Sequence, residues 1–309
     1  MNKAVILFGP TSSGKTEASI LLARELGTEI ISADSMQLYR LMDIGTGKPA
    51  PSQLAEVRHH LIDVIWPDET WSAGRFADEA SRTMERLSGE GRIPVIVGGT
   101  GLYIKALTRG LMEAPQADEA LRAELLKKEE DLYGLLEEMD PETARILAPA
   151  DTRRILRALE VQIKTKRAAS ELKRDLTMPL PYDFIKVGLT RDRAELYTLI
   201  EDRVDRMLMD GLVQEVREVL GRRKPPSKTA MQAIGYKEVE GFLMGQYPYE
   251  EAVRLIKRNT RRYAKRQFTW FKKEEGAVWV DVSGLKGADE IYGRLKEALM
   301  KARPDIYRP

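Results

Sequence analysis

The stretch GPTSSGKT, residues 9–16, combines residue types that bind phosphate groups. It meets the pattern G-x-x-x-x-G-K-[S/T] through Gly9, Gly14, Lys15 and Thr16. Glycines let the backbone curl so that N–H groups face one anion, the lysine adds a charge, and the hydroxyl can ligate Mg²⁺. The stretch follows an apolar run and opens a helical pattern, as a working phosphate loop requires. Its ligand stays open: a nucleotide to be hydrolysed, a nucleotide used as phosphate donor, or another diphosphate.

Two polar residues follow other predicted strands. Asp34 ends the run IISAD, and Thr100 follows the glycines of IPVIVGGT. Because ligands of doubly wound sheets bind at the carboxyl ends of the strands, we expect both residues at the crevice of the phosphate loop. A carboxylate there can bind Mg²⁺ or a substrate hydroxyl, or accept a proton. The simpler interpretations are a helix cap for Asp34 and turn chemistry for Thr100.

The segment EDRVDRML places Arg203 and Arg206 on one face of a predicted helix. The planar guanidinium group suits a diphosphate because it can donate two parallel hydrogen bonds. Both arginines could equally be solvated partners of Glu201, Asp202 and Asp205, and the pattern does not decide between these functions.

Residues 254–273 hold nine Lys or Arg and no acidic residue, although the whole chain is balanced, with 50 Lys and Arg against 48 Asp and Glu. Clustering of one sign in a balanced chain favours a polyanion, and nucleic acid in particular, over a merely solvated face. The segment DTRRILRALE, residues 151–160, is a second basic cluster. Three-four spacing in the first segment also predicts a packed stripe of Val253, Ile256, Thr260, Tyr263, Gln267 and Trp270.

Short apolar runs alternate with helical patterns along both ends of the chain. This alternation predicts an α/β fold of the phosphate-loop NTPase type, a parallel sheet with helices on both faces. Between residues 113 and 182 only helical patterns occur. We therefore predict a catalytic core from residues 1–112 and 183–309 and an inserted all-helical domain over residues 113–182. The expected strands are residues 4–8, 29–35, 93–99, 184–190 and 277–283.

Composition excludes several kinds of site. The chain has no cysteine, so disulfides, thiolate catalysis and cysteine-based zinc sites are ruled out. No run of 18 apolar residues and no signal-peptide pattern occurs, which favours a cytoplasmic protein without a membrane anchor. His59 and His60 are adjacent and lack a third ligand at metal spacing, so we expect structural roles for them. Asp192 and Glu195 predict a capping box.

Longer motifs resemble those of one family. They are, in order, GPTSSGKT, ISADSMQLYRLMDIGTGKP, HHLIDV, IPVIVGGTGLY, RRILRALEV, QAIGYKE and NTRRYAKRQFTWFK. Together they resemble bacterial tRNA dimethylallyltransferases, also called tRNA isopentenyltransferases, over essentially the whole chain. The resemblance implies transfer of a dimethylallyl group from dimethylallyl diphosphate to N6 of the adenosine 3′-adjacent to the anticodon in tRNA. Pyrophosphate would be released, so the loop would hold a leaving group and not a nucleotide.

The same resemblance implies roles for particular residues. Asp34 would be the general base, Lys15 and Arg203 would stabilise the departing diphosphate, and Thr100 would contact tRNA near the reacting base. Mg²⁺ would lie near Thr16, with Asp34 as a further candidate ligand. The diphosphate-binding residues would be Gly9, Pro10, Thr11, Ser12, Ser13, Gly14, Lys15 and Thr16.

A monomer would bind the anticodon stem-loop, with the helical insertion gripping it and the basic helix holding its backbone. One departure is Gln232, where many relatives carry a basic residue, so a phosphate contact there is in doubt. The zinc-finger tail of eukaryotic relatives is also absent. The implied tRNA-binding residues are Asp34, Ser35, Met36, Gln37, Thr100, Arg122, Arg153, Arg154, Ile155, Leu156, Arg157, Gln232, Ala233, Ile234, Gly235, Tyr236, Lys237, Arg261, Arg262, Lys265 and Arg266.

Two other functions fit part of the sequence. A phosphate-loop kinase for small molecules would use Asp34 to activate a hydroxyl and Arg203 in a lid, but it leaves the basic helix without a purpose. An RNA-binding protein with incidental ATPase activity leaves Asp34 and Thr100 without one.

Overall fold

The structure is a computed structural model that describes residues 1–112, 114–115, 117–127, 131–175 and 179–307. The chain divides into two compact units, which we call the sheet unit, Met1–Ile104 with Pro181–Pro309, and the helical unit, Lys105–Leu180. Helix α4, Gly101–Arg109, runs across the first division. Residue 113, where we predicted the insertion to begin, lies outside the described residues.

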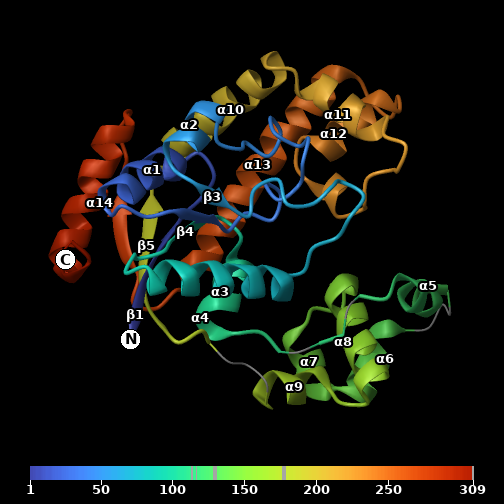
Figure 1. Ribbon diagram of the computed structural model, residues 1–309. Helices are drawn as coiled ribbons and strands as arrows, with labels where there is room; N and C mark the ends of the chain where they lie inside the picture. The colour runs from blue at the N-terminus through green and yellow to red at the C-terminus, as the bar shows by residue number, and fades with distance from the viewer. Residues whose placement is uncertain (113, 116, 128–130, 176–178, 308–309) are drawn as a thin grey trace. The chain divides into compact units, whose positions relative to one another are not determined.

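The sheet unit is built on a six-stranded parallel sheet in the order β3-β2-β4-β1-β5-β6. Strands β1, β3, β4 and β5 of this sheet are labelled in Figure 1. Strands up to β4 lie on one side of β1 and later strands lie on the other, so the loop after β1 occupies the point where ligands bind in such sheets. The five predicted strands are confirmed, and β3 was missed because two residues carry no periodic pattern. The strands are β1 Asn2–Phe8, β2 Ile30–Ser32, β3 His59–His60, β4 Val95–Gly98, β5 Tyr182–Thr190 and β6 Val278–Asp281.

Both faces of this sheet are covered, as predicted. Val5 and Leu7 of β1 belong to a buried cluster that includes residues of α1 and α14. Phe8 stacks on Phe271 of α13, with ring centroids 4.6 Å apart. Burial on both sides explains why the strands read as continuous apolar runs and not as alternating ones.

The helices of the sheet unit follow the predicted βα alternation. Asp192 is confirmed as an N-cap, because its carboxylate accepts hydrogen bonds from the amides of Ala194 and Glu195. The reciprocal half of the capping box was wrong, since the Asp192 amide donates to the Ser283 hydroxyl. The helices are α1 Lys15–Glu25, α2 Pro51–Glu56, α3 Ala73–Gly89, α10 Arg193–Met209, α11 Leu212–Leu220, α12 Tyr236–Leu243, α13 Tyr249–Phe271 and α14 Ala288–Ala302, with 3-10 turns at Ala230–Gln232 and Pro304–Ile306.

The described part of the helical unit contains helices and no strand. It has its own core, in which Leu136 and Leu159 are fully buried. None of the described helices of either unit is long and apolar enough to cross a membrane. The helices of this unit are α5 Glu119–Lys127, α6 Leu132–Met139, α7 Pro141–Ile146, α8 Thr152–Thr165 and α9 Ala169–Asp175.

Candidate active site

The phosphate loop joins β1 to α1 and holds donors that have no protein partner. The hydroxyls of Ser12 and Ser13 are buried and have no hydrogen-bond partner among the described residues. Ser12 has a φ of 63°, a left-handed conformation that a residue with a side chain adopts only under constraint. An unsatisfied buried polar group costs about 1–3 kcal/mol. Two of them in one loop indicate that a ligand supplies the missing contacts.

Two cations meet at this loop. Lys15 Nζ donates to the Pro10 carbonyl at 2.6 Å, and Arg203 Nη1 donates to Thr11 Oγ1 at 3.4 Å. Burial, and then the charge of Arg203, lowers the pKa of Lys15 to about 8. Neither cation forms an ion pair with an acid in the part of the chain that the structure describes. Unpaired buried charge is unfavourable, so an anion bound here would relieve a penalty already present.

The two arginines of α10 differ in their surroundings. Arg203 reaches the phosphate loop, whereas Arg206 is exposed and donates back to the Asp202 carbonyl of its own helix.

Asp34 follows β2 and is a candidate base. The helix-cap interpretation was wrong, because the next described helix begins only at Pro51 and the Asp34 carboxylate closes a turn instead. Its Oδ1 accepts hydrogen bonds from the amides of Met36 at 2.8 Å and Gln37 at 3.4 Å. Its Oδ2 has no hydrogen-bond partner among the described residues. Burial raises the pKa of Asp34, while the two amides and the charges of Lys15 and Arg203 act in the opposite direction. One oxygen therefore fixes the side chain and leaves the other available for a proton.

Thr100 lies beside the residue that follows Asp34. Its hydroxyl accepts from the Ser35 amide at 3.0 Å and donates to Ser35 Oγ at 3.3 Å. Its own amide donates to the Ala33 carbonyl at 3.2 Å, which joins the ends of β2 and β4. The structure thus brings the Asp34 and Thr100 segments together, as expected from their places at the ends of neighbouring strands.

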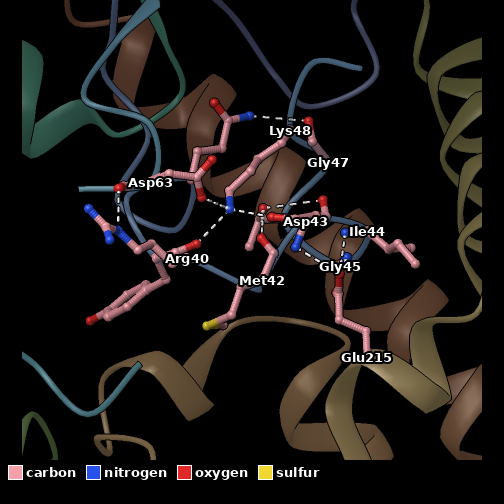
Figure 2. Close-up of polar contacts among 12 residues, drawn as sticks. Arg40, Met42, Asp43, Ile44, Gly45, Gly47, Lys48, Asp63 and Glu215 are labelled. Atoms are coloured by element: carbon pink, nitrogen blue, oxygen red, sulfur yellow. Dashed lines mark hydrogen bonds and ion pairs between the residues drawn. The ribbon is translucent and has the colours of Figure 1, made fainter. Parts of the chain in front are cut away.

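Sequence reasoning missed a second loop beside the site, Met42–Lys48 (Figure 2). The side chain of Lys48 is 5% exposed, and its Nζ contacts Asp43 Oδ1 and Asp63 Oδ1 at 2.5 Å each and the Tyr39 carbonyl at 2.6 Å. Three consecutive backbone amides, from Asp43 to Gly45, donate to the carboxylate of Glu215 at 2.7–3.0 Å. The motif DIGTGK signalled a loop, but nothing in the sequence pointed to its partners.

The Met42–Lys48 loop supports Arg203. The guanidinium of Arg203 lies so close to Gly47 that a Cβ at this position would clash with it. The Gly47 carbonyl accepts from Gln37 Nε2 at 3.2 Å, and Gln37 Oε1 accepts from Ser32 Oγ at 3.0 Å. Glu215 therefore holds a loop that packs against Arg203 and is hydrogen-bonded to Gln37, whose own backbone amide contacts Asp34.

The chain matches known proteins over most of its length. The family model described as IPP transferase matches residues 37–274. A tRNA dimethylallyltransferase of Thermodesulfovibrio yellowstonii is 51% identical, over 97% of this chain and 99% of its own. The chain belongs to the IPP transferase family. The relative from Thermotoga maritima, with the same name, is 46% identical over 97% of this chain and 98% of its own.

Solved IPP transferase structures share this fold. The tRNA isopentenylpyrophosphate transferase of Bacillus halodurans has a TM-score of 0.70 and 36% identity, and the match covers 100% of both chains. A eukaryotic dimethylallyltransferase, whose structures are described as snapshots of the enzyme acting on tRNA, has a TM-score of 0.83 and 28% identity, with 100% of this chain and 81% of that chain covered.

The segment from Gln232 to Lys237, which the IPP transferase resemblance assigned to tRNA, is mostly internal. Only Gln232 and Lys237 are exposed. Tyr236 is fully buried and its hydroxyl donates to the carboxylate of Glu215. The Ala233 and Tyr236 side chains are buried and therefore unavailable to RNA, and the Tyr236 ring lies against Gly45 of the Met42–Lys48 loop.

The basic helix α13 is less uniformly charged on its surface than its sequence indicated. Its Lys257 pairs with Asp205 at 2.7 Å, and its Arg261 pairs with Glu201; both acids come from α10. Arg262, Lys265 and Arg266 are exposed and form no ion pair among the described residues. Our packed stripe was wrong at its end, because Trp270 is 39% exposed.

Two of the arginines that were predicted to contact RNA in the helical unit are paired with a buried carboxylate. Arg122 Nη2 and Arg157 Nη1 both donate to Glu160 Oε2, at 3.1 and 2.6 Å, and the Glu160 side chain is 0% exposed. Burial raises the pKa of Glu160, but hydrogen bonds from Arg157, the Asp118 amide and Arg122 outweigh it and hold that pKa below its ordinary value.

The rest of that predicted group is split between the core and the surface. Ile155 and Leu156 are buried in the core of the helical unit, so their side chains cannot meet RNA. Arg153 and Arg154 are exposed.

Proposed function

We propose that this chain transfers a dimethylallyl group from dimethylallyl diphosphate to N6 of the adenosine 3′-adjacent to the anticodon in tRNA. Membership of the IPP transferase family supports dimethylallyl transfer to tRNA. The observation that carries the rest is the proximity of Asp34, whose Oδ2 is available, to two cations, Lys15 and Arg203, whose charges act on it and which form no ion pair with any described carboxylate. Such a site can take a proton and hold a leaving anion in the same reaction.

The reaction balances with these groups. N6 of the adenosine attacks the allylic carbon, the bond from that carbon to the diphosphate oxygen breaks, and its electron pair leaves with pyrophosphate. One N6 proton passes to Asp34, because an exocyclic amine cannot remain protonated after attack. Lys15 and Arg203 hold the charge that develops on the departing oxygen, which is the most effective place for fixed cations. Burial raises the pKa of Asp34 toward the range in which a carboxylate is a useful base.

Mg²⁺ fits the donor set of the phosphate loop. The described residues contain no group of three or more His, Cys, Asp or Glu side chains that could hold a metal ion. Mg²⁺ in phosphate sites takes only one or two protein oxygens and completes its shell with water and substrate phosphates. Thr16, with Asp34 as a second candidate, would hold it, and the partnerless hydroxyl of Ser13 adds a further oxygen. When bound, the ion neutralises diphosphate charge.

The exposed cations of α13, together with Arg153 and Arg154 of α8, are the candidate contacts for the tRNA backbone. An anticodon loop suits this site because its bases leave their stack more easily than those of a duplex. Action as a monomer and location in the cytoplasm both stay predictions from the sequence.

One assay tests the proposal directly. The protein is incubated with unmodified tRNA, Mg²⁺ and dimethylallyl diphosphate but no ATP, and the digested nucleosides are weighed. We expect adenosine to gain one five-carbon unit, and tRNA in which the target adenosine is replaced by guanosine to gain none. Modification of the replaced tRNA, or none of either, would contradict the proposal, and so would phosphorylation of a small molecule that requires ATP.

A further inference from the structure

Gln267 of α13 lies between the two loops of the candidate site. Its side chain is buried, with 6% of the residue exposed. Its Oε1 accepts from the Thr11 amide at 2.9 Å, and its Nε2 donates to the Gly99 carbonyl at 3.0 Å. These are contacts to the phosphate loop and to the loop that carries Thr100. Sequence spacing had placed Gln267 in a packing stripe and gave it no other role.

The two contacts require a side chain of this length that accepts at one atom and donates at the other, as the neutral glutamine amide does. A backbone amide can only donate and a carbonyl can only accept, so the orientation of the Gln267 amide is determined by its partners. Glutamate lacks the donor when ionised, methionine lacks both groups, and asparagine is one methylene too short. Gly99 completes the fit, because a Cβ at this position would clash with Gln267 Nε2.

The same face of α13 reaches Thr100 one turn earlier. The Tyr263 side chain lies near Thr100, and burial followed by the charge of Asp34 raises the pKa of Tyr263. Trp270, one turn beyond Gln267, lies against Gly101 closely enough to exclude a Cβ there. One rigid helix therefore contacts the Gly99–Gly101 segment at three successive turns and the phosphate loop at one point.

We propose that Gln267 is a positioning residue that sets the separation between the phosphate loop and the loop bearing Thr100. The inference rests on the proposed function, in which the first loop holds the diphosphate and the second lies beside the acceptor base. Gln267 would touch neither substrate. It would keep the allylic carbon and the acceptor nitrogen at attack distance, a requirement so strict that a displacement of about 1 Å lowers the rate by about a hundredfold.

The main test replaces Gln267 by methionine, which has a similar length but neither hydrogen-bonding group. We expect kcat to fall by about 10- to 100-fold, while the Kd of pyrophosphate and the Kd of an anticodon stem-loop, each measured alone, change less than about threefold. Gln214→Met makes the same chemical change at an exposed position of α11 and should leave kcat unchanged. A loss of kcat matched by an equal loss of affinity, or an unchanged kcat, would overturn the inference.

A second variant, Gln267→Glu, separates positioning from general damage. Its carboxylate can still accept from Thr11 but would face the Gly99 carbonyl, whereas its protonated form can donate as Gln267 does. The titratable groups facing this position are Tyr263 on α13 and Arg203, which contacts Thr11 from α10. We expect the ratio of its kcat to that of the wild type to rise as pH falls from about 8 to 6, since burial beside a carbonyl favours the protonated acid.

A ratio that does not change with pH would count against the inference, and should Gln267→Met fail to fold, Gln267→Glu carries the test alone. The wild-type assay distinguishes a failure of the proposed function from a failure of the role proposed for Gln267. If wild-type protein transfers no dimethylallyl group, the proposed function fails; if it is active and both variants match it, only the role of Gln267 fails.

Discussion

The sheet unit and the helical unit both contain clustered arginine, but the two clusters differ in their neighbours. Arg203 contacts Thr11 and Gly47 and forms no ion pair among the described residues, although the charges of Glu17 and Asp34 act on it from further away. Arg122 and Arg157 converge on Glu160, a carboxylate with no solvent exposure. The first arrangement leaves positive charge for a ligand, and the second uses most of it to complete a fold. A buried carboxylate, and not the number of arginines, decides which of the two occurs.

The largest effect should follow from removing the proton acceptor of the sheet unit. Asp34→Asn keeps an oxygen for the amides of Met36 and Gln37 but loses the charge. We expect turnover to fall by about 10²- to 10⁴-fold, the usual range for a general base, with little change in tRNA affinity. Single-turnover rates and filter binding measure the two quantities, and Asp78→Asn at an exposed position of α3 is the control. Equal losses of rate and affinity would refute the proton-transfer role.

In the helical unit the corresponding change should affect stability. Glu160→Gln leaves two partly exposed arginines beside an uncharged group, and we expect the loss of these charged hydrogen bonds to cost about 1.5–3 kcal/mol. Hydrogen exchange of the α8 amides in the full chain reports the loss. Glu171→Gln removes an exposed pair with Arg167 and should cost under about 1 kcal/mol.

The same carboxylate predicts a pH dependence. Because the folded-state pKa of Glu160 lies below its ordinary value, its contribution is present above about pH 4 and is lost as pH falls through the folded pKa. Wild-type protection of α8 should therefore weaken in acid, and Glu160→Gln should remove that part of the change. Equal acid sensitivity in both proteins would show that Glu160 is not the cause.

A smaller effect concerns the positive charge of the phosphate loop and its pH dependence. With a Lys15 pKa of about 8, pyrophosphate binding should be strong below that pH and weaken as pH rises through it. Relative to binding well below pH 8, the loss should approach about tenfold by pH 9, one pH unit beyond the pKa, and about fivefold of it should fall between pH 8 and 9. Calorimetric titration measures it, and Lys15→Met separates the titration of pyrophosphate itself. An identical pH profile in both proteins would contradict the assignment.

The smallest effect concerns α13, which contains both kinds of cation. Lys265→Ala should reduce the salt dependence of tRNA binding by about one unit of slope, because each phosphate contact releases about one counterion. Arg254 is paired with Glu251 at 2.6 Å, so Arg254→Ala should change the slope less. Equal slopes for the two variants would mean that pairing within the fold does not predict RNA contact.

Much of the fold was predictable from local pattern. Buried parallel strands are continuous apolar runs, and the backbone geometry of a phosphate loop requires its glycines, lysine and threonine at a fixed spacing. Strand β1, helix α1 and the loop could therefore be predicted without tertiary information. Asp34 and Thr100 were placed near each other because neighbouring parallel strands end at the same edge. His60 has the structural role expected of it, with Nε2 at 2.6 Å from Glu29.

Other features could not be predicted, because the residues involved are distant in sequence. Glu215 contacts amides 170–172 residues away, and Gln267 contacts groups 168 and 256 residues away. Contacts between residues so far apart leave no periodic pattern in the sequence. The sequence therefore does not show whether a glutamine on a helix faces water or contacts two loops.

The residue pattern alone thus indicated which chemistry the chain carries: a cradle for a diphosphate, an acid at a strand end and a cationic helix. Tertiary structure decided which charges stay available, since neutralisation depends on whether the fold brings a carboxylate within about 4 Å. Hydrogen bonds and ion pairs act over such short distances that chain separation has no bearing on them. For this reason Arg122, which pairs with Glu160 of another helix, and Arg203, which forms no ion pair among the described residues, differ in what they can bind.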